Sequence, residues 1–414
     1  MPNPSRFSKL TKFASSIAPG VFLIGYVIGT GSVTTMAAAG AKYGLSLIWT
    51  SFLASFFTYI MFVAISKSTI VTGKTLLYNF KVNFGAGVTI FLIAGLMTTQ
   101  IASIIGVMGI VTEVIAEFSK QFSATGAGIN TLHSALFFTL LLCSLFWFGR
   151  HKAFLEALAI LVALMGLSFV VTMFMVMPPP VEFLRGMVPS VPSEGNAALL
   201  IAGMVGTTMA GVCLVTRSTL VIEKGWTPRD FKVEHRDSFI SVTLMLVINV
   251  AIMASAAGTM FVRGLEVTHA VDMIQALEPL AGQLAATLFV VGIVSAGLSS
   301  LFPNYLLGLW LLSDFFDTPR DTRRPGYRAL VLGCASVGLV IPLFGGSPVA
   351  IMIASQALSP FIMPVMTILL ALLLNKKAVM GEYAGGKLLN AGLGITVVFT
   401  LYMLYTAIIG FSAM

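Results

Sequence analysis

The sequence predicts an all-α integral membrane protein of about eleven transmembrane helices. Three observations predict it: the composition, the lengths of the apolar runs and the placement of the basic residues. Of the 414 residues, 57% are hydrophobic and only 10% are charged, and the mean hydropathy is +0.97. Soluble domains carry roughly 25% charged residues, so this composition is typical of a chain that lies in a bilayer.

Eleven apolar runs are long enough to cross a bilayer, which takes about 20 residues of helix. They lie near residues 17–41, 45–66, 86–112, 131–149, 153–177, 196–222, 238–261, 282–313, 327–346, 348–374 and 390–411. The linkers between them are short, and none has the composition of a soluble domain. We expect residues 1–16 to form a cytoplasmic tail and residues 375–414 to form a cytoplasmic loop and the eleventh helix.

The basic residues fall mainly in alternate linkers. If the N-terminus is cytoplasmic, only four of the 24 Lys and Arg residues lie in external segments: Lys42, Lys120, Arg185 and Arg263. This distribution follows the positive-inside rule. It predicts a multi-pass protein of the cell (inner) membrane, with the N-terminus cytoplasmic and Met414 external. The net charge of +8 is explained by this topology, so we expect the lipid bilayer as a partner and no nucleic acid.

Two spans are interrupted in their middles by glycine and hydroxyl residues. The candidate substrate-binding residues at these two places are Gly29, Thr30, Gly31 and Ser32 in the first span, and Thr207, Thr208, Met209, Ala210 and Gly211 in the sixth. Four complete spans separate the interruptions, which predicts two inverted five-helix repeats at residues 17–177 and 178–374. Paired interruptions of this kind mark the binding sites of many transporters. The alternative is that the glycines are close helix-packing contacts.

Several stretches resemble the Nramp family, proton-coupled divalent-metal transporters of the LeuT-like fold. Ala18–Gly20 and Ala39–Ser46 resemble the two ends of the Nramp first helix, and Thr287–Phe316 is similar to its eighth helix. Ser355–Gly381 resembles the tenth helix and the loop after it. The resemblance covers nearly the whole chain. It implies a 5+5 inverted repeat with helices 1 and 6 broken, and alternating-access transport of a small molecule or ion.

The family's metal ligands are replaced in this sequence. The Asp of the first-helix motif falls on Gly29, and the Asn falls on Ser32. The Met and His of the sixth-helix motif fall on Ala210 and Val212, and a second His falls on Arg217. The chain is therefore similar to a divergent branch of the family.

These replacements change the substrate that we expect. The tenth-helix Gln of the family falls on Ile362, so hydroxyls and backbone carbonyls are the main ligands left. A divalent ion without its water needs anionic or strongly dipolar ligands, and a thioether favours soft metals. Free N–H groups at a helix start favour an anion instead. We expect no metal site and no cofactor, and a small solute that is neutral or carries a carboxylate.

Four polar residues are candidates for the transport pathway or for coupling to protons or sodium: Arg217, Asn249, Asn304 and Gln356. Arg217 would either face the inner pathway as a fixed cation or extend to the cytoplasm. The three amides either bridge helices, the more common role, or line the cavity. The mixed-charge segment 223–237 is expected to be a solvated connecting loop.

The sequence leaves other classes of function open. A divalent-metal transporter with a rebuilt site is the main alternative, for example for Mg²⁺ kept partly hydrated or for Mn²⁺. A transporter-derived membrane sensor is another, although such receptors usually carry cytoplasmic output segments that this sequence lacks. An enzyme is not expected, because the sequence has no Walker-type loop, no complete dinucleotide fingerprint and no Cys/His metal cluster.

Overall fold

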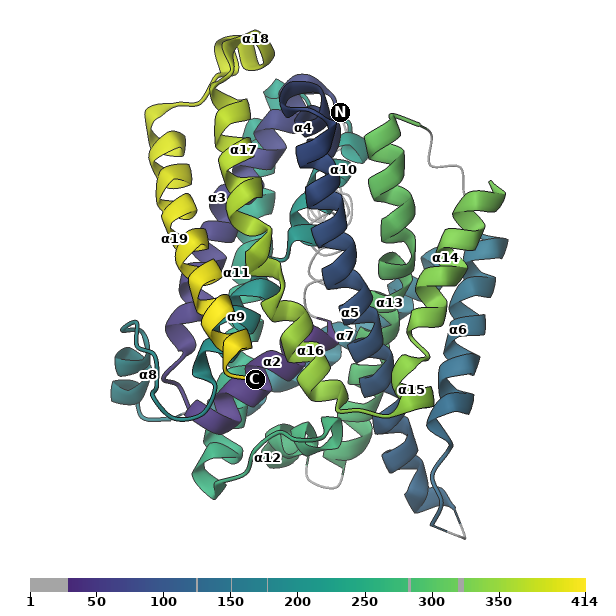
Figure 1. The fold of residues 1–414 in the computed structure, drawn as a ribbon. Coiled ribbons are helices and arrows are strands. Elements are labelled where there is room, and N and C mark those ends of the chain that lie inside the picture. Colours follow the sequence, from purple (N-terminus) through teal and green to yellow (C-terminus); the bar gives the residue numbers. More distant parts are fainter. Residues whose placement is uncertain (1–28, 124–125, 150, 177, 282–283, 319–323) are drawn as a thin grey trace, which may run out of the picture.

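In the computed structural model, the described part of the chain comprises residues 29–123, 126–149, 151–176, 178–281, 284–318 and 324–414. It is built almost entirely from helices, most of them long and packed side by side (Figure 1). Within this part, nine helices are long and apolar enough to cross a membrane. The predicted all-α, multi-pass architecture is confirmed. The predicted tail, residues 1–16, and the first part of the first span lie outside the described residues.

Seven spans run without a break. They are α3 (Ile48–Thr72), α5 (Ala86–Ser119), α6 (Thr131–Phe148), α7 (His151–Met175), α11 (Phe231–Thr259), α13 (Ala285–Phe316) and α19 (Lys387–Ser412). Large apolar side chains project outward from them, such as Leu140, Ile160 and Val398, which are 69%, 63% and 67% exposed. Such a surface is stable when lipid tails cover it, because the tails remove it from water.

The count of eleven spans is not confirmed. Of the first run only α2 (Thr30–Tyr43, 14 residues) is described. The ninth run is divided into α14 (Pro325–Val337) and α15 (Val340–Phe344), of 13 and 5 residues. At the division, the N–H groups of Gly338 and Leu339 bond to carbonyls three residues earlier, the tighter 3₁₀ pattern, so one straight helix does not form.

The sixth span is broken where the sequence predicted. Helix α9 (Ala197–Thr208) ends and α10 (Gly211–Lys224) begins after two non-helical residues, Met209 and Ala210. Ala210 has extended backbone angles, with φ −61° and ψ 129°. The first span has a matching feature, because α2 begins at Thr30 inside the predicted interruption.

The tenth span is also broken, although the sequence predicted one continuous span at residues 348–374. It consists of α16 (Pro348–Ala357), a short 3₁₀ turn η6 (Ser359–Phe361) and α17 (Met363–Asn375). Pro360 and Pro364 lack the N–H that a continuous α-helix needs, and this favours the break.

The broken helices pack closely in the centre of the bundle. Helix α2 packs against α11 and α9, and α16 packs against α5 and α9. Two glycines permit this approach: a Cβ on Gly40 would lie 2.3 Å from Met253 O, and one on Gly206 would lie 1.9 Å from Gln356 O. Close helix packing is therefore the role of these two glycines, and Gly206 belongs to the interruption of the sixth span.

Short helices cover the two ends of the bundle. They are α4 (Leu76–Phe84), α8 (Pro180–Gly186), α12 (Glu278–Ala281), α18 (Lys377–Met380), η1 (Lys120–Phe122), η2 (Pro228–Asp230), η3 (Phe261–Arg263), η4 (Ala270–Leu277) and η7 (Gly381–Tyr383). Figure 1 shows α4 and α18 at the upper end, and α8 and α12 at the lower end.

Candidate functional site

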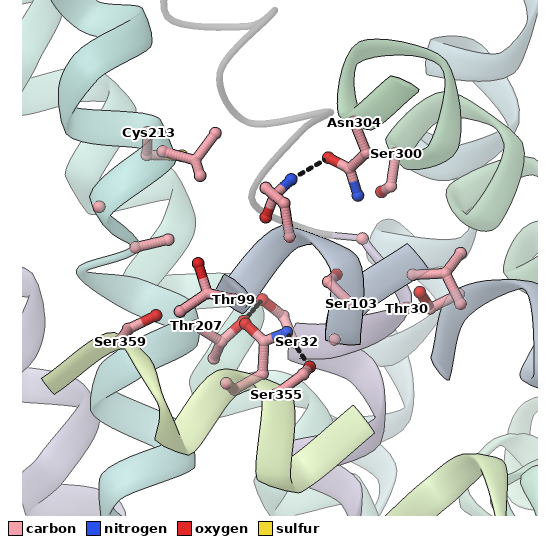
Figure 2. Close-up of a pocket in the computed structure, with 18 residues that line it drawn as sticks. Thr30, Ser32, Thr99, Ser103, Thr207, Cys213, Ser300, Asn304, Ser355 and Ser359 are labelled. Carbon is pink, nitrogen blue, oxygen red and sulfur yellow. Dashed lines mark hydrogen bonds between the residues drawn. The ribbon is translucent and has the colours of Figure 1, made fainter. Parts of the chain in front are cut away.

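A small cavity lies where the interrupted helices meet, among α2, α5, α9, α10, α13, α16 and η6 (Figure 2). It contains about 50 Å³ of space open to the centres of water molecules. The described residues that line it are Gly29, Thr30, Gly31, Ser32, Thr99, Gln100, Ser103, Val107, Thr207, Ala210, Gly211, Val212, Cys213, Ser300, Asn304, Ser355, Gln356 and Ser359. Hydroxyls and amides dominate this lining, and none of these side chains is charged.

Two helix N-termini face the cavity. Helix α2 follows Gly29, whose backbone is extended at φ −87° and ψ −175°, and α10 follows Ala210. No side chain caps either helix start. The first intrahelical bonds are donated by Val33 and Leu214, so the N–H groups of the three residues before each donor have no partner within the helix. These helix ends favour an electron-rich group in the cavity.

A pair of hydroxyls joins α2 to α9. Ser32 Oγ on α2 lies 2.9 Å from Thr207 Oγ1 on α9, and both side chains are buried. The next residue, Thr208, is turned away from the cavity: it donates to Met204 O and accepts from Asn249 Nδ2 at 3.1 Å. Met209 is fully buried and is not part of the lining. Of the nine predicted binding residues, Thr208 and Met209 therefore lie behind the cavity wall.

The amide candidates divide in the same way. Asn304 on α13 accepts a hydrogen bond from Gln100 Nε2 on α5 at 2.5 Å, so it both bridges helices and lines the cavity. Gln356 lines the cavity and donates to Ser355 Oγ at 3.1 Å. Asn249 only bridges, through Thr208.

Two lining hydroxyls have no hydrogen-bond partner in the described part of the chain: Thr30 Oγ1 and Ser300 Oγ. Both side chains are buried: Thr30 is 0% exposed and Ser300 is 6% exposed. A buried polar group without a partner costs about 1–3 kcal/mol. A ligand or a water molecule in the cavity would satisfy these two hydroxyls, which Figure 2 labels. They add two hydrogen-bonding groups to the free N–H groups at the starts of α2 and α10.

Arg217 lies away from the cavity, in a buried ion cluster. Its Nη1 donates to Asp237 Oδ2 at 2.5 Å, and its Nη2 donates to Glu234 Oε1 at 3.2 Å. Its Nε donates to Ser66 Oγ at 3.0 Å. Arg217 and Glu234 are 0% exposed, so Arg217 does not extend into the cytoplasm. The expectation of a solvated loop at 223–237 is wrong at its C-terminal part, because residues 231–237 belong to α11 and two of them are these buried carboxylates.

Several lining residues are not among the predicted site residues, namely Thr99, Ser103, Cys213, Ser300, Ser355 and Ser359. One pattern was available to find most of them: polar residues four apart in otherwise apolar helices, as in Thr99 with Ser103 and Ser300 with Asn304. Cys213 gave no such signal. It is nearly fully buried and contributes the one thiol of the described lining.

The described residues contain no group of three or more His, Cys, Asp or Glu placed to hold a metal ion. A bundle of membrane-spanning helices broken around a small polar cavity defines a membrane transporter. Comparison with known sequences gives the family. The chain matches the family model described as "Natural resistance-associated macrophage protein-like" over residues 21–410, and it belongs to the Nramp family. The resemblance noted in the sequence is confirmed.

Curated relatives agree with this assignment. The chain is 29% identical over 410 residues to the divalent metal cation transporter MntH of Erwinia tasmaniensis, covering 95% of this chain and 94% of the relative. It is 28% identical over 392 residues to MntH of Klebsiella pneumoniae, covering 91% of this chain and 89% of the relative.

Solved structures show the same fold. A mutant form of the manganese transporter of Eremococcus coleocola aligns with a TM-score of 0.75 at 14% identity, covering 98% of this chain and 87% of that one. Mhp1, a nucleobase-cation-symport-1 family transporter with bromovinylhydantoin bound, aligns with a TM-score of 0.60 at 14% identity, covering 95% and 92%. The LeuT-like fold predicted from the resemblance is confirmed.

Proposed function

We propose that this Nramp-family chain is a secondary transporter that moves a small solute by alternating access through the cavity, and that the solute is not a bare Mn²⁺ or Fe²⁺ ion. One observation carries the proposal. The described lining combines hydroxyls, amides and two helix N-termini, and it contains no carboxylate, imidazole or thioether. The relatives are named for divalent metals, whereas the positions that the resemblance assigns to the ligands are Gly29, Ser32, Ala210 and Val212.

The energetics of dehydration argue against a bare metal ion. A divalent ion that leaves water for a low-dielectric site needs anionic ligands to offset its desolvation. Among the described lining residues, the one side chain with a donor atom softer than oxygen or nitrogen is Cys213, and it is buried. Structural and catalytic metal sites use several protein ligands, so a single thiol is not enough to hold the ion.

The same groups fit a small anionic or neutral polar solute. The N–H groups at the starts of α2 and α10 and the hydroxyls of Thr30 and Ser300 are all able to donate hydrogen bonds. One water needs about 10–15 Å³ of comparable space, so the cavity holds roughly three to five waters. A solute of a few non-hydrogen atoms, such as a small carboxylate, matches this size in the conformation described.

A divalent cation with part of its water retained is the second candidate. The names of the relatives favour it, and the cavity volume leaves room for water ligands. Mg²⁺ gives up its water reluctantly and binds oxygen, which suits hydroxyls and carbonyls. Cys213 would suit Mn²⁺ less well than it would suit a softer ion.

For coupling and orientation we propose sodium or proton coupling, a cytoplasmic N-terminus and an external C-terminus in the inner membrane. The positive-inside distribution of Lys and Arg supports the orientation. The carbonyl end of α9 supports coupling to a small cation, because half-helix C-termini coordinate sodium or protons in broken-helix transporters. Uptake into proteoliposomes under a sodium gradient alone or a pH gradient alone distinguishes the two ions.

The test of the substrate is a thermal-stability screen of the purified protein against Mn²⁺, Mg²⁺, amino acids and small carboxylates. A ligand at about 100 times its Kd stabilises by about 2.7 kcal/mol. The matched control is Gly29→Asp with Ala210→Met, which restores two ligands of the family motif; the φ of −87° at Gly29 accepts a side chain. We expect micromolar Mn²⁺ to stabilise the variant and not the native protein. Equal stabilisation of both would overturn the proposal.

A further inference from the structure

A large groove on the outside of the bundle is separate from the transport cavity. It lies between α3, the start of α11, the η7 turn and the first half of α19, and it contains about 900 Å³. Its walls are mostly apolar. Phe56 and Ile395 on these walls are 55% and 59% exposed, and Ile60, one helical turn after Phe56 on α3, lines the groove as well. In Figure 1 the groove corresponds to the upper parts of α3 and α19, below α18.

One end of the groove carries positive charge. Lys67 near the end of α3 and Lys387 at the start of α19 both line it, together with His235. Within the described residues, neither lysine has an ion pair, whereas Lys42, Lys74 and Lys120 each pair with a carboxylate. One carboxylate, Glu382, also lines the groove. The two lysines outnumber this carboxylate, so this end of the groove is able to accept a negatively charged group.

The distance from the charged end to the apolar end matches one leaflet of a bilayer. Lys67 and Phe56 are eleven residues apart on α3, which is about 16 Å along a helix. On α19, Lys387 and Ile395 are eight residues apart, or about 12 Å. The hydrocarbon core of a bilayer is about 30 Å thick, so one leaflet is about 15 Å deep. A groove with this depth and with cations at its outer edge has the dimensions of a lipid.

We propose that this groove binds an anionic phospholipid, with its phosphate at Lys67 and Lys387 and its acyl chains along the apolar wall of α3 and α19. The positive-inside rule places these lysines on the cytoplasmic side, where basic pockets between helices meet anionic headgroups. The site is independent of the substrate that the central cavity carries.

The groove is linked to the buried ion cluster. His235 Nδ1, at the groove, lies 3.1 Å from Glu234 Oε2, and Glu234 is paired with Arg217. The cluster joins α3, α10 and α11 through Ser66, Arg217 and the two carboxylates. A bound headgroup would therefore lie next to the contact that fixes the inner half of the sixth span.

The first experiment measures lipid binding to the purified full chain in detergent by native mass spectrometry, with phosphatidylglycerol and phosphatidylcholine as probes. The test variant is Lys67→Gln with Lys387→Gln. The control is Lys232→Gln with Lys377→Gln, which removes the same charge from two exposed lysines outside the groove. We expect the test variant to bind phosphatidylglycerol roughly ten- to thirtyfold more weakly, since each lysine near an anionic surface contributes about one factor of five. The control should stay within about twofold.

A second variant tests the apolar part of the site. Ala391 is exposed and lines the groove, and Ala391→Trp fills it without changing its charge. We expect Ala391→Trp to weaken phosphatidylglycerol binding while thermal stability in lipid-free detergent stays unchanged. We also expect inorganic phosphate at millimolar concentration not to compete with the lipid. The proposal fails if both lipids bind equally, if the two lysine variants weaken binding equally, or if inorganic phosphate displaces the lipid.

Discussion

Ser32 Oγ and Thr207 Oγ1 lie 2.9 Å apart and join α2 to α9 through a neutral hydroxyl pair. Each residue lies beside one of the two predicted interruptions, Ser32 at the start of α2 and Thr207 near the end of α9. Ser32 stands where the family resemblance implies a metal ligand, and in this chain its hydroxyl instead shares a hydrogen bond with Thr207. The pair lines the cavity and fixes the distance between its two helical walls.

Removing this pair is expected to weaken substrate binding. Loss of one buried hydrogen bond costs about 0.5–1.5 kcal/mol, which corresponds to roughly two- to tenfold in affinity. We expect Ser32→Ala and Thr207→Val each to raise the Kd for the substrate by this factor. The double variant should be affected less than the product of the two, because both changes remove the same bond.

The control for this pair is Ser68→Ala, which removes a buried hydroxyl of α3 that bonds to its own helix at Ile65 O and is not part of the cavity lining. It should leave the Kd unchanged. A strictly multiplicative double variant would show that the two hydroxyls act separately.

A side chain at Gly31 is expected to disturb the cavity through Gln356. A Cβ on Gly31 would lie 3.0 Å from Gln356 Nε2 and 3.1 Å from its Cδ. Because that amide also donates to Ser355, Gly31→Ala requires it to shift by a few tenths of an ångström and strains this hydrogen bond. We expect several-fold slower uptake in proteoliposomes. Adding Gly31→Ala to Gln356→Ala should cause no further loss, and an additional loss in that background would contradict the mechanism.

The sequence predicted the parts of the site that depend on local backbone. Gly29–Ser32 and Gly206–Gly211 interrupt apolar runs, and such residues predict broken helices before any packing is known. The remaining lining depends on which faces of unbroken helices meet. Ser300 and Ser103 are ordinary hydroxyls in apolar spans, and their common cavity follows from the packing of α13 and α5 against each other.

Arg217 illustrates the same limit. Its partners Glu234 and Asp237 are 17 and 20 residues away, beyond the turn between α10 and α11. Sequence periodicity within one helix relates residues three or four apart, so it cannot pair these charges. Composition alone therefore predicts that the two carboxylates are solvated, whereas Glu234 is 0% exposed and Asp237 is 2% exposed.

Replacing Arg217 by an apolar residue is expected to destabilise the protein strongly. Arg217→Leu leaves two carboxylates in a buried site, and breaking a buried ion pair typically costs about 3–5 kcal/mol. We expect a clear fall in the thermal midpoint in detergent. The triple variant Arg217→Leu, Glu234→Gln, Asp237→Asn removes all three charges and should recover part of the loss. An Arg217→Leu protein as stable as the native one would show that the cluster does not hold α10 to α11.

The ion pair between His269 and Glu113 predicts a pH dependence at the opposite end of the bundle. His269 Nδ1 lies 2.7 Å from Glu113 Oε1, and this contact raises the pKa of His269 above its ordinary value of 6.5. Because the folded pKa is the higher one, the stabilisation is fully present below about pH 6.5 and is lost as the pH rises through the raised pKa.

His269→Asn keeps an N-cap side chain for η4 and removes the charge. The difference in thermal midpoint between the native protein and this variant should be largest at acidic pH and should shrink at alkaline pH. Since the His269 side chain is 67% exposed, the difference should also be small and should decrease in high salt. A difference that does not change with pH would show that the contact acts through packing and not through charge.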